Sequence, residues 1–333
     1  MPDRWSGIER TVTKDIWLAQ QLPPLPWPVH HRAPRIVTFY SFKGGVGRTT
    51  LVAAYALHLA SKGIKVAVID LDLEAPGIGT LLDVRTNRGV IDLLADHIAT
   101  GAMDLDDSYG YADAFGDLAD KIAVFPAGRL DTAFVSKLAR LDFASDEIGA
   151  PTEIPVSNAL KNLLRRLRRE GYGAILLDAR AGIHDLAGLS LHGFAHVDVL
   201  VFRGTTQNID GLRLTLDVLN RRRRDDLKPW VLVHTLLPAS QEDYERRRSE
   251  IQQRVYDLFI DRIYEGDDVP QLNDRDAAHE TMPLRRKPWL EDVDTLRGLA
   301  DTLLADEELR AIAQRIDEPW DEDLSKSESE DAS

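Results

Sequence analysis

A glycine-rich segment between an apolar strand and an apolar helix constrains the fold of this 333-residue chain more than any other feature. Residues 35–42 predict a buried strand, and residues 50–62 predict the helix that follows it. Between them stand Lys43, Gly44, Gly45, Val46, Gly47, Arg48, Thr49 and Thr50. Glycines let a backbone bend around a phosphate and point successive N–H groups at it, and a helix start adds a positive dipole end. This order predicts a phosphate-binding loop in which the Thr49 hydroxyl is a Mg²⁺ ligand.

Apolar strands alternate with helices along most of the chain. Further strands are predicted at 65–70, 121–128, 174–178, 197–202 and 229–234, and further helices at 89–98, 158–170, 208–222, 241–259 and 292–315. Such alternation is typical of a parallel sheet that is covered on both faces. We therefore expect an α/β fold of the P-loop NTPase class: a doubly wound, mainly parallel sheet with helices on both faces and the ligand at the carboxyl ends of the strands.

Three regions are expected along the chain. Residues 1–34 form an amino-terminal extension with a proline-rich connector, which either packs its tryptophans on the body as a strap or binds a partner. Residues 35–316 form the P-loop domain. Residues 317–333 carry eight acids and one lysine, and we expect this acidic tail to be disordered because it has little apolar surface to bury.

Composition excludes several classes of function. The chain has no cysteine, which rules out disulfides and thiolate-held iron–sulfur or zinc sites. The first residues lack the apolar core of a signal peptide, and no apolar run reaches membrane-spanning length, so a cytoplasmic location is expected. A net charge of −14 gives no general attraction to nucleic acid.

The loop KGGVGRTT, with a lysine directly before Gly-Gly, resembles the deviant Walker motif of the partition and division-site-selection (ParA/MinD-like) ATPases. The resemblance implies that the chain binds ATP and Mg²⁺ and that Lys43 reaches across a dimer interface to the partner's nucleotide. Arg48 stands where the family has a second lysine. Arginine keeps the charge and can bind phosphate through its fork, but its longer, planar group is not equivalent to an ammonium. We expect phosphate binding to be retained and hydrolysis to be slowed.

Carboxylates follow two of the predicted strands. Asp70 and Asp72 end the second strand, and Asp178 ends the strand at 174–178. The resemblance implies that Asp72 positions the attacking water and acts in catalysis together with Lys43. It also implies that Asp70 and Asp178 hold the magnesium ion through water, beside Thr49. The alternative for Asp70 and Asp72 is a pair of acids at an exposed strand end.

Two nearby residues remain open. Glu74 has no predicted role. Arg180 either contacts a phosphate or pairs with a surface acid.

At the base end, His234 and Thr235 and the loop 270–273 are expected to flank adenine, although the family has an asparagine where this chain has His234.

Arginines cluster at 165–169 and at 221–224. Partition ATPases bind DNA through basic patches, so non-specific DNA binding is one interpretation of Arg165, Arg166, Arg168, Arg169 and the second cluster. The other is that these arginines offset helix dipoles and pair with Glu170, Asp225 and Asp226, and the acidic net charge favours it. The acidic residues after the last helix argue against the membrane-binding role known in division-site ATPases.

The leading functional hypothesis is a Mg²⁺-dependent dimerisation switch of the ParA/MinD type, a weak ATPase that forms an ATP-dependent homodimer and controls a regulatory protein partner. The alternative is a non-hydrolysing nucleotide-bound scaffold or regulatory pseudo-ATPase, in which Arg48 has removed turnover. A third possibility, metal-cofactor insertion, resembles another branch of the superfamily, but the absent cysteines count against it.

Overall fold

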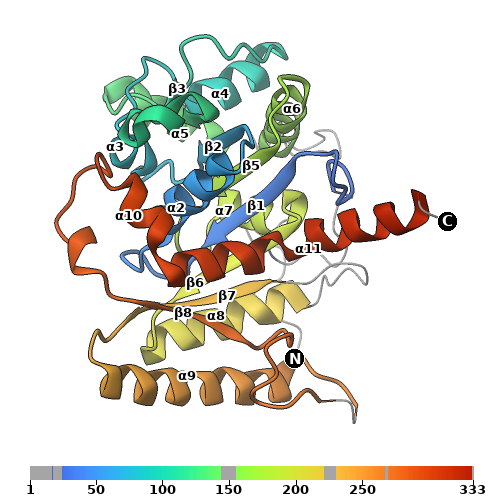
Figure 1. Cartoon of the computed structure of the whole chain (residues 1–333). Coiled ribbons are helices and arrows are strands. Elements are labelled where there is room, and N and C mark those ends of the chain that lie inside the picture. Colours follow the sequence, from blue (N-terminus) through green and yellow to red (C-terminus); the bar gives the residue numbers. More distant parts are fainter. Residues whose placement is uncertain (1–16, 18–24, 144–154, 221–229, 267–268, 332–333) are drawn as a thin grey trace, which may run out of the picture.

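The computed structural model describes residue 17 and residues 25–143, 155–220, 230–266 and 269–331 (Figure 1). Eight strands form one sheet. In chain order the strands are β1 (Arg35–Tyr40), β2 (Val66–Asp70), β3 (Gly110–Tyr111), β4 (Ile122–Phe125), β5 (Ala174–Asp178), β6 (Val197–Phe202), β7 (Val231–Leu237) and β8 (Thr281–Arg285).

The sheet has the strand order β3-β4-β2-β5-β1-β6-β7-β8. All neighbouring strands are parallel except β3 and β4, which are antiparallel. β1 lies between β5 and β6, so the carboxyl ends of these three strands meet at one edge of the sheet. The predicted fold class, a doubly wound and mainly parallel sheet, is confirmed.

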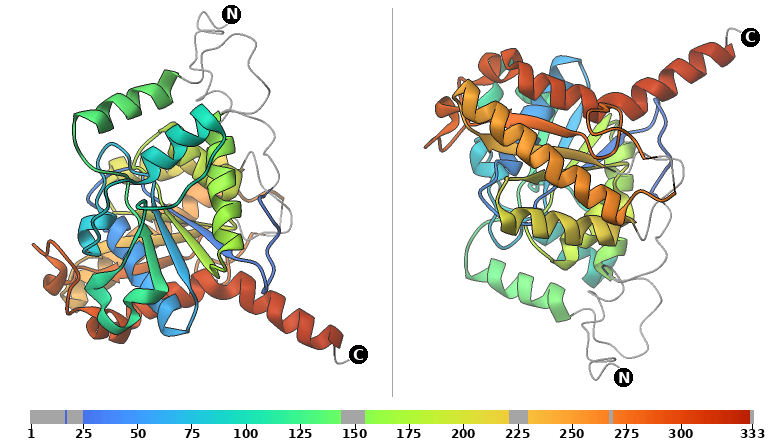
Figure 2. Two further views of the ribbon diagram at one scale, coloured as in Figure 1. Left: turned by 90° about the horizontal axis from the view of Figure 1, so that it is seen from above. Right: turned by 90° about the horizontal axis from the view of Figure 1, so that it is seen from below.

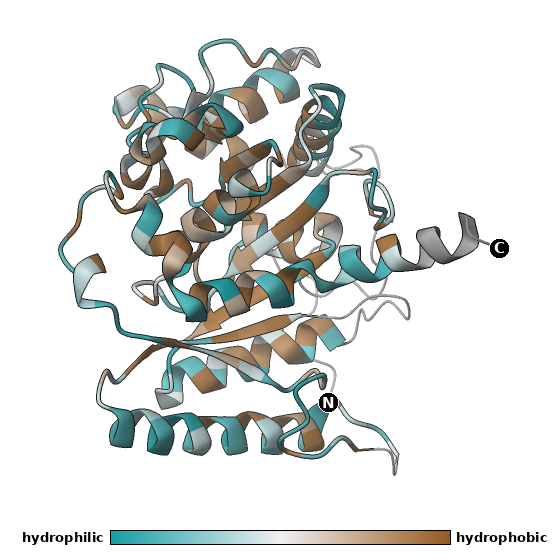
Figure 3. Cartoon of the chain, viewed as in Figure 1, coloured by the Kyte–Doolittle hydropathy of each residue, from teal (hydrophilic) through white to brown (hydrophobic). Residues whose placement is uncertain are grey.

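Helices cover both faces of the sheet. They are α2 (Arg48–Ser61), α3 (Ile78–Leu81), α4 (Val90–Thr100), α5 (Thr132–Phe143), α6 (Pro155–Arg169), α7 (Asp185–Leu189), α8 (Thr206–Asn220), α9 (Gln241–Arg262), α10 (Ala300–Ala305) and α11 (Glu307–Asp331), with short helical turns η1 (Asp113–Lys121), η2 (Ser190–Phe194) and η3 (Pro288–Leu290). One apolar cluster joins the sheet to α2, α10 and α11, and a second joins it to α4, α6, α8 and α9. Hydrophobic residues accordingly concentrate in the strands (Figure 3).

The six predicted strands are present, with ends shifted by a few residues. The edge strand β8 was missed because its sequence, TMPLR, contains Pro283. Proline has no backbone N–H to donate to a neighbouring strand, so a strand that contains it is difficult to predict from sequence. Such strands are found at sheet edges. The short strand β3 and the helices α5 and α7 were also missed. The helix predicted at 292–315 was partly right: residues 300–305 form α10 and residue 307 begins α11, whereas residues 292–299 are not helical.

The prediction of a disordered tail from residue 317 was wrong as well. α11 continues to Asp331 and extends beyond the sheet (Figure 2), and Asp317 and Trp320 are 1 % and 2 % exposed. The Asp317 carboxylate accepts hydrogen bonds from Arg35 Nη1 at 2.6 Å, Tyr55 Oη at 2.7 Å and Lys62 Nζ at 2.8 Å. The high content of acidic residues in this segment predicted a solvated tail, but one of its carboxylates, that of Asp317, belongs to the core.

Burial alone raises the pKa of the Asp317 carboxyl, but hydrogen bonds and charges from His58, Arg35, Lys62 and Tyr55 lower it well below its usual value. The ionised carboxylate therefore stabilises the folded state, and it holds α11 to α2 and β1.

The proline-rich connector packs on the body through its tryptophans, as the strap interpretation predicted. Trp27 is 4 % exposed, and its indole N–H donates to the Pro34 carbonyl at 2.7 Å. Trp17 is equally buried, and its indole donates to the His184 carbonyl at 2.9 Å. The other residues of 1–24 lie outside the described part of the chain.

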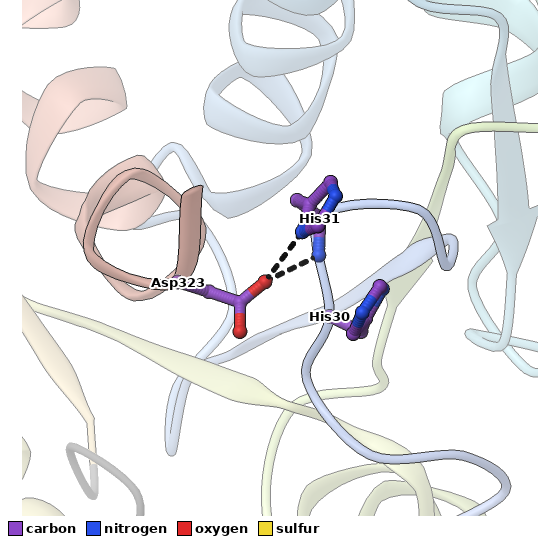
Figure 4. Close-up of side chains that lie close together, drawn as sticks. All are labelled: His30, His31 and Asp323. Atoms are coloured by element: carbon purple, nitrogen blue, oxygen red, sulfur yellow. Dashed lines mark hydrogen bonds and ion pairs between the residues drawn. The ribbon is translucent and has the colours of Figure 1, made fainter. Parts of the chain in front are cut away.

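A histidine pair next to the connector meets α11 (Figure 4). Asp323 accepts hydrogen bonds from the His31 backbone N–H at 2.7 Å and from the ring Nδ1 at 3.0 Å. His30, His31 and Asp323 are residue types that bind metals, and their ligand atoms lie within 4.8 Å of one another. However, Arg32 donates to the other ring nitrogen of His31 and to His30 Nδ1, so three of the four ring nitrogens are already engaged. We interpret the cluster as a clasp between connector and helix.

None of the helices in the described ranges is long and apolar enough to cross a membrane.

Asp317→Asn is expected to lower the free energy of unfolding by about 2–4 kcal/mol, because it removes the charge shared by buried Tyr55, half-buried Arg35 and exposed Lys62. The pKa of Asp317 is lowered in the folded state, so its contribution is complete above about pH 4 and is lost as the pH falls through the folded pKa. The difference between wild type and variant should therefore shrink in acid. Urea unfolding at several pH values measures both the loss of stability in the variant and its dependence on pH. Asp321→Asn, on the exposed side of α11, is the matched control, and an equal effect of the two substitutions would contradict the assignment.

Candidate functional site

The phosphate loop occupies the turn between β1 and α2, as predicted. Gly45 and Gly47 have φ values of 70° and 84°, a left-handed conformation that favours glycine. A Cβ added at Gly44, Gly45 or Gly47 would meet no atom within 4 Å, so the loop borders open space. The helix then begins at Arg48, and Leu51 N–H donates to the Gly47 carbonyl at 3.0 Å. An open, glycine-lined helix start of this kind suits an anionic ligand.

Three carboxylates lie beside the loop. Asp178 ends β5 and Asp70 ends β2, and the two residues are direct neighbours in the parallel register. Asp70 accepts the backbone N–H groups of Asp72 at 3.0 Å and Gly77 at 3.3 Å, which fixes the turn after β2. Asp70, Asp72 and Asp178 are 0 %, 7 % and 1 % exposed. The alternative of an acid pair at an exposed strand end is therefore wrong.

Arg48 links two of these carboxylates. Its Nε lies 2.6 Å from Asp178 Oδ1, and its Nη2 lies 3.1 Å from Asp72 Oδ2. The guanidinium thus points into the carboxylates and is itself buried. Thr49 also hydrogen-bonds the Asp178 carboxylate, whose buried Oδ2 has no hydrogen-bond partner among the described residues. An unpartnered carboxylate oxygen next to a threonine hydroxyl is a donor set that suits Mg²⁺.

The carboxylates carry more negative charge than Arg48 offsets. Burial and the neighbouring charge of Asp178 raise the pKa of Asp70 well above its usual value. Burial also raises the pKa of Asp178, although Arg48 and Thr49 partly oppose this. Burial lowers the pKa of Arg48, but Asp178 and Asp72 outweigh it, and the guanidinium stays charged. The site therefore favours an additional cation.

Lys43 is half-buried at the start of the loop. No hydrogen bond or ion pair connects its side chain to another residue in the described ranges. A lysine next to a phosphate loop that has no partner in the described part of the chain is available to bind a charge from elsewhere.

Glu74 and Arg180 form an ion pair with each other. Glu74 Oε1 also lies 3.2 Å from His184 Nε2. Glu74 follows the strand end that carries Asp72, and Arg180 follows the one that carries Asp178, so the pair connects the two loops that flank the phosphate loop. Of the two predictions for Arg180, pairing with an acid is the one seen in this structure, and Glu74 acquires a partner that its sequence position did not reveal.

A cavity of about 390 Å³ opens on the other side of the loop. Its lining combines the phosphate loop and the first turn of α2 with Arg203 after β6, the carboxyl ends of β7 and β8, the segment after β8 and one residue of α11. The lining residues are Gly45, Val46, Gly47, Thr50, Leu51, Arg203, Thr235, Leu236, Leu284, Arg285, Arg286, Lys287, Leu290, Glu291 and Leu309. Thr235 Oγ1 donates to the Val46 carbonyl at 2.7 Å and thereby ties the cavity wall to the phosphate loop. Leu236 has a φ of 56°, rare for a branched side chain, at an irregularity in the β7–β8 register.

The basic residues of the cavity wall are mostly paired. Arg285 Nε lies 2.6 Å from Glu308, Arg286 Nε lies 2.6 Å from Glu291, and Lys287 contacts Asp306 and Glu308. Arg203 has no side-chain partner among the described residues. It is therefore the cation of this wall that is available to a ligand.

The residues expected to flank adenine do not all lie together. Thr235 lines the cavity, but the loop 270–273 does not. Tyr256 donates to the Pro270 carbonyl, and a His279 ring nitrogen lies 3.2 Å from the Leu272 carbonyl. Both contacts lie near the amino end of β8, opposite the phosphate loop. The end of β8 and the residues after it, up to Glu291, line the cavity instead.

His234 does not line the cavity. It is 3 % exposed and stacks on Phe202 with ring centroids 5.5 Å apart. Burial, with a smaller contribution from Arg247, lowers the pKa of its imidazole to about 4. The side chain is a neutral core histidine beneath the site.

The first arginine cluster, on α6, is engaged in the way that its pairing interpretation predicted. Arg166 pairs with Glu170 at 2.8 Å, and the Arg168 guanidinium lies over the Trp27 ring at 5.1 Å. The second cluster, 221–224, lies outside the described residues together with Asp225 and Asp226.

Known proteins resemble the chain in sequence and in fold. A ParA family model, described as NUBPL iron-transfer P-loop NTPase, matches residues 32–99. The chromosome-partitioning ATPase Soj of Thermus thermophilus is 30 % identical over 254 residues, which cover 74 % of this chain and 88 % of that protein. An uncharacterized ATP-binding protein of Methanocaldococcus jannaschii is 36 % identical over 62 residues, 19 % of this chain and 24 % of that protein, so the chain matches about a quarter of this relative.

Among solved structures, the septum site-determining protein MinD of Pyrococcus horikoshii, complexed with Mg-ADP, superposes with a TM-score of 0.54 at 20 % identity. The superposition covers 86 % of this chain and 95 % of that one. MinD of Aquifex aeolicus gives a TM-score of 0.53 at 18 % identity, over 85 % and 96 %. At these identities the likeness establishes the fold.

The lowered pKa of His234 predicts a pH-dependent stability. In the unfolded chain the imidazole takes up a proton near pH 6.5, whereas in the folded protein it does so near pH 4. Stability should therefore fall as the pH drops from 6.5 toward 4, by up to about 3 kcal/mol from this residue. His234→Asn should flatten this slope, as measured by urea unfolding at each pH. His30→Asn, at an exposed ring, is the control and should leave the slope unchanged. An unaltered slope in His234→Asn would show that the imidazole is not the titrating group.

Proposed function

Because this chain belongs to the ParA/MinD-like family of P-loop NTPases, we propose that it is an ATP-binding, Mg²⁺-dependent dimerisation switch with slow hydrolysis. In this proposal the dimer controls a regulatory protein partner. The observation that carries the proposal is the free, half-buried Lys43 beside an open phosphate loop, close to three buried carboxylates.

The residues at the site fit a nucleotide and its metal ion. The backbone of Gly44 to Thr50 would bind the phosphates, and the 390 Å³ cavity between the loop and Leu236 would take the base. Thr49 would hold Mg²⁺ directly, and Asp70 and Asp178 would hold it through water; the unpartnered Oδ2 of Asp178 supports this. When bound, Mg²⁺ offsets the charge of the β- and γ-phosphates.

Asp72 and Lys43 are the proposed catalytic residues. Asp72 lies in the turn after β2, where its backbone N–H donates to the Asp70 carboxylate, and we propose that its own carboxylate orients a water molecule. Lys43 has no side-chain partner among the residues that the structure describes, and it would bind the phosphates of the nucleotide in a second copy. That contact would make dimerisation depend on ATP, since without phosphates the ammonium would face a second copy unpaired.

A non-hydrolysing scaffold is the second candidate, and the Arg48 bridge favours it. Arg48 holds both Asp72 and Asp178, so turnover requires these ion pairs to break. Iron transfer, which the description of the family model names, is not proposed because the chain has no cysteine thiolate with which to hold a cluster. DNA binding is not proposed either, because the net charge is −14 and two of the α6 arginines, Arg166 and Arg168, are paired or stacked.

ATP is expected to convert the protein from monomer to dimer, because Lys43 gains a phosphate partner only across an interface. Light scattering with Mg²⁺ and a slowly hydrolysed ATP analogue measures the mass. Lys43→Ala should weaken dimerisation by about tenfold or more while it retains nucleotide binding by calorimetry. Thr49→Ala should instead weaken Mg–ATP binding itself.

Lys65→Ala is the matched lysine control, since Lys65 precedes β2 at the opposite edge of the sheet. A wild-type protein that stays monomeric with saturating analogue would exclude the switch. Equal dimerisation by Lys43→Ala and wild type would exclude the role of Lys43.

Hydrolysis by the wild type is expected to be slow, and Arg48→Lys should accelerate it by about tenfold to a thousandfold. A lysine at this position is compact enough to follow the phosphates as charge shifts, and it releases at least one of the two carboxylates. Single-turnover hydrolysis of labelled ATP measures the rate, and Asp72→Ala should abolish it. Arg88→Lys, in an exposed ion pair with Asp96, is the control. An unchanged or lower rate in Arg48→Lys would identify Arg48 as an adapted catalytic group, and no turnover in either protein would favour the scaffold.

A further inference from the structure

The contacts of Arg48 differ from those expected of a phosphate-binding residue. Its guanidinium does not extend over the open loop but turns to the carboxyl ends of β2 and β5, where Asp72 and Asp178 accept its two edges. The three side chains are 9 %, 11 % and 1 % exposed, so solvent screens the pairs weakly. The cation is therefore held in the interior of the site.

The shape of the guanidinium accounts for this arrangement. Nε and Nη2 donate along different directions of one rigid plane, and each reaches a different carboxylate at 2.6 Å and 3.1 Å. An ammonium on a shorter stem is a single point charge and cannot reproduce both contacts with this geometry. The bridge thus depends on an arginine at this position of the loop.

The bridge also uses the ligands that a divalent ion needs. Arg48 binds Asp178 Oδ1, and Thr49 hydrogen-bonds the same carboxylate, which leaves only Oδ2 without a partner. Asp70, the neighbour of Asp178 across the β2–β5 register, lies in the same cluster. One built-in positive charge is therefore located among the groups that would otherwise attract a metal ion.

We propose that Arg48 acts as a tethered cation that closes the divalent-metal site until a nucleotide draws it away. Phosphate oxygens offer the guanidinium a doubly charged, bidentate partner. Once Arg48 turns to them, Asp178 loses its counter-charge and becomes able, together with Asp70, to hold a metal ion, and Asp72 is released as well. Nucleotide then binds before or together with the metal ion, and the metal ion does not bind first. The inference rests on the proposed magnesium site of this chain.

Arg48 is a gating residue in this proposal, so its test is metal binding in the absence of nucleotide. Mn²⁺, observed by electron paramagnetic resonance in buffer free of Mg²⁺ and nucleotide, is the probe. Wild type should bind Mn²⁺ weakly. Arg48→Met, which keeps an unbranched apolar stem and removes the charge, should bind it about tenfold more tightly or better, since buried carboxylates then lack a cation. Mn²⁺ should also raise the melting temperature of Arg48→Met more than that of wild type.

Two further variants locate the effect. Arg48→Met combined with Asp178→Asn should lose the gain, because the metal ion then lacks its central carboxylate. Arg88→Met removes an arginine from an ion pair of the same 2.6 Å length, but one that is exposed to solvent, and it should bind Mn²⁺ no better than wild type. An equal gain in Mn²⁺ affinity in Arg88→Met would mean that any aspartate without its arginine partner binds the ion, and it would contradict a specific role of Arg48.

Equal Mn²⁺ affinity in wild type and Arg48→Met, whether strong or absent, would overturn the proposal. If Arg48→Met does not fold without metal, Arg48→Lys makes the same test, because its ammonium cannot hold both carboxylates and its Mn²⁺ affinity must still exceed that of wild type. None of these samples contains nucleotide. Failure of ATP to bind or to drive dimerisation would therefore refute the proposed function without affecting the Mn²⁺ result. Equal Mn²⁺ affinities would likewise refute the role of Arg48 without affecting the proposed function.

Discussion

The carboxyl end of β1 lies between those of β5 and β6 because the three strands pair in parallel, and this register determines what surrounds the phosphate loop. The loop leaves β1 and cannot avoid the end of β5, where Asp178 stands, or that of β2 one strand further. Carboxylates gathered in this way are buried and repel one another, so a cation must accompany them. Arg48 supplies that cation from the first turn of α2, and the ligand-free site is stable because of it.

Packing on both faces of the sheet keeps the loop in place. On one face α2 is held by α11, whose Asp317 takes hydrogen bonds from Arg35 at the start of β1 and from Tyr55 within α2. On the ligand side, the Thr235 hydroxyl near the end of β7 donates a hydrogen bond to the Val46 carbonyl of the loop. The strand before the loop, the helix after it and the loop itself are each anchored by a separate hydrogen bond, which is partly buried for the strand and buried for the other two. A rigid frame of this kind leaves side-chain rotation, not backbone movement, as the means by which Arg48 changes partners.

Sequence patterns predicted those parts of the structure whose causes are local. Six apolar strands, the glycine turn and the carboxylates at strand ends follow from periodicity and from the order of elements. The errors arose where a long-range contact decides the structure. Asp317 reads as one acid of an acidic tail until Arg35, 282 residues away, is brought to it. β8 is a strand because β7 pairs with it in spite of Pro283. Because β8 was missed, the sequence placed loop 270–273 beside the cavity, whereas the end of β8 lines it.

The same limit applies to Arg48. From the sequence, Arg48 is expected to bind phosphate with a larger, planar group than lysine, and this difference is predicted to weaken stabilisation of the transition state for hydrolysis. In the structure the guanidinium already has two buried partners, so a ligand must exchange one set of charge-assisted hydrogen bonds for another. Its affinity then reflects the difference between the two sets, not the strength of the phosphate contacts alone. On the proposal that this bridge opens when nucleotide binds, slow turnover and a requirement for a strongly anionic ligand have one physical origin, the two ion pairs of Arg48.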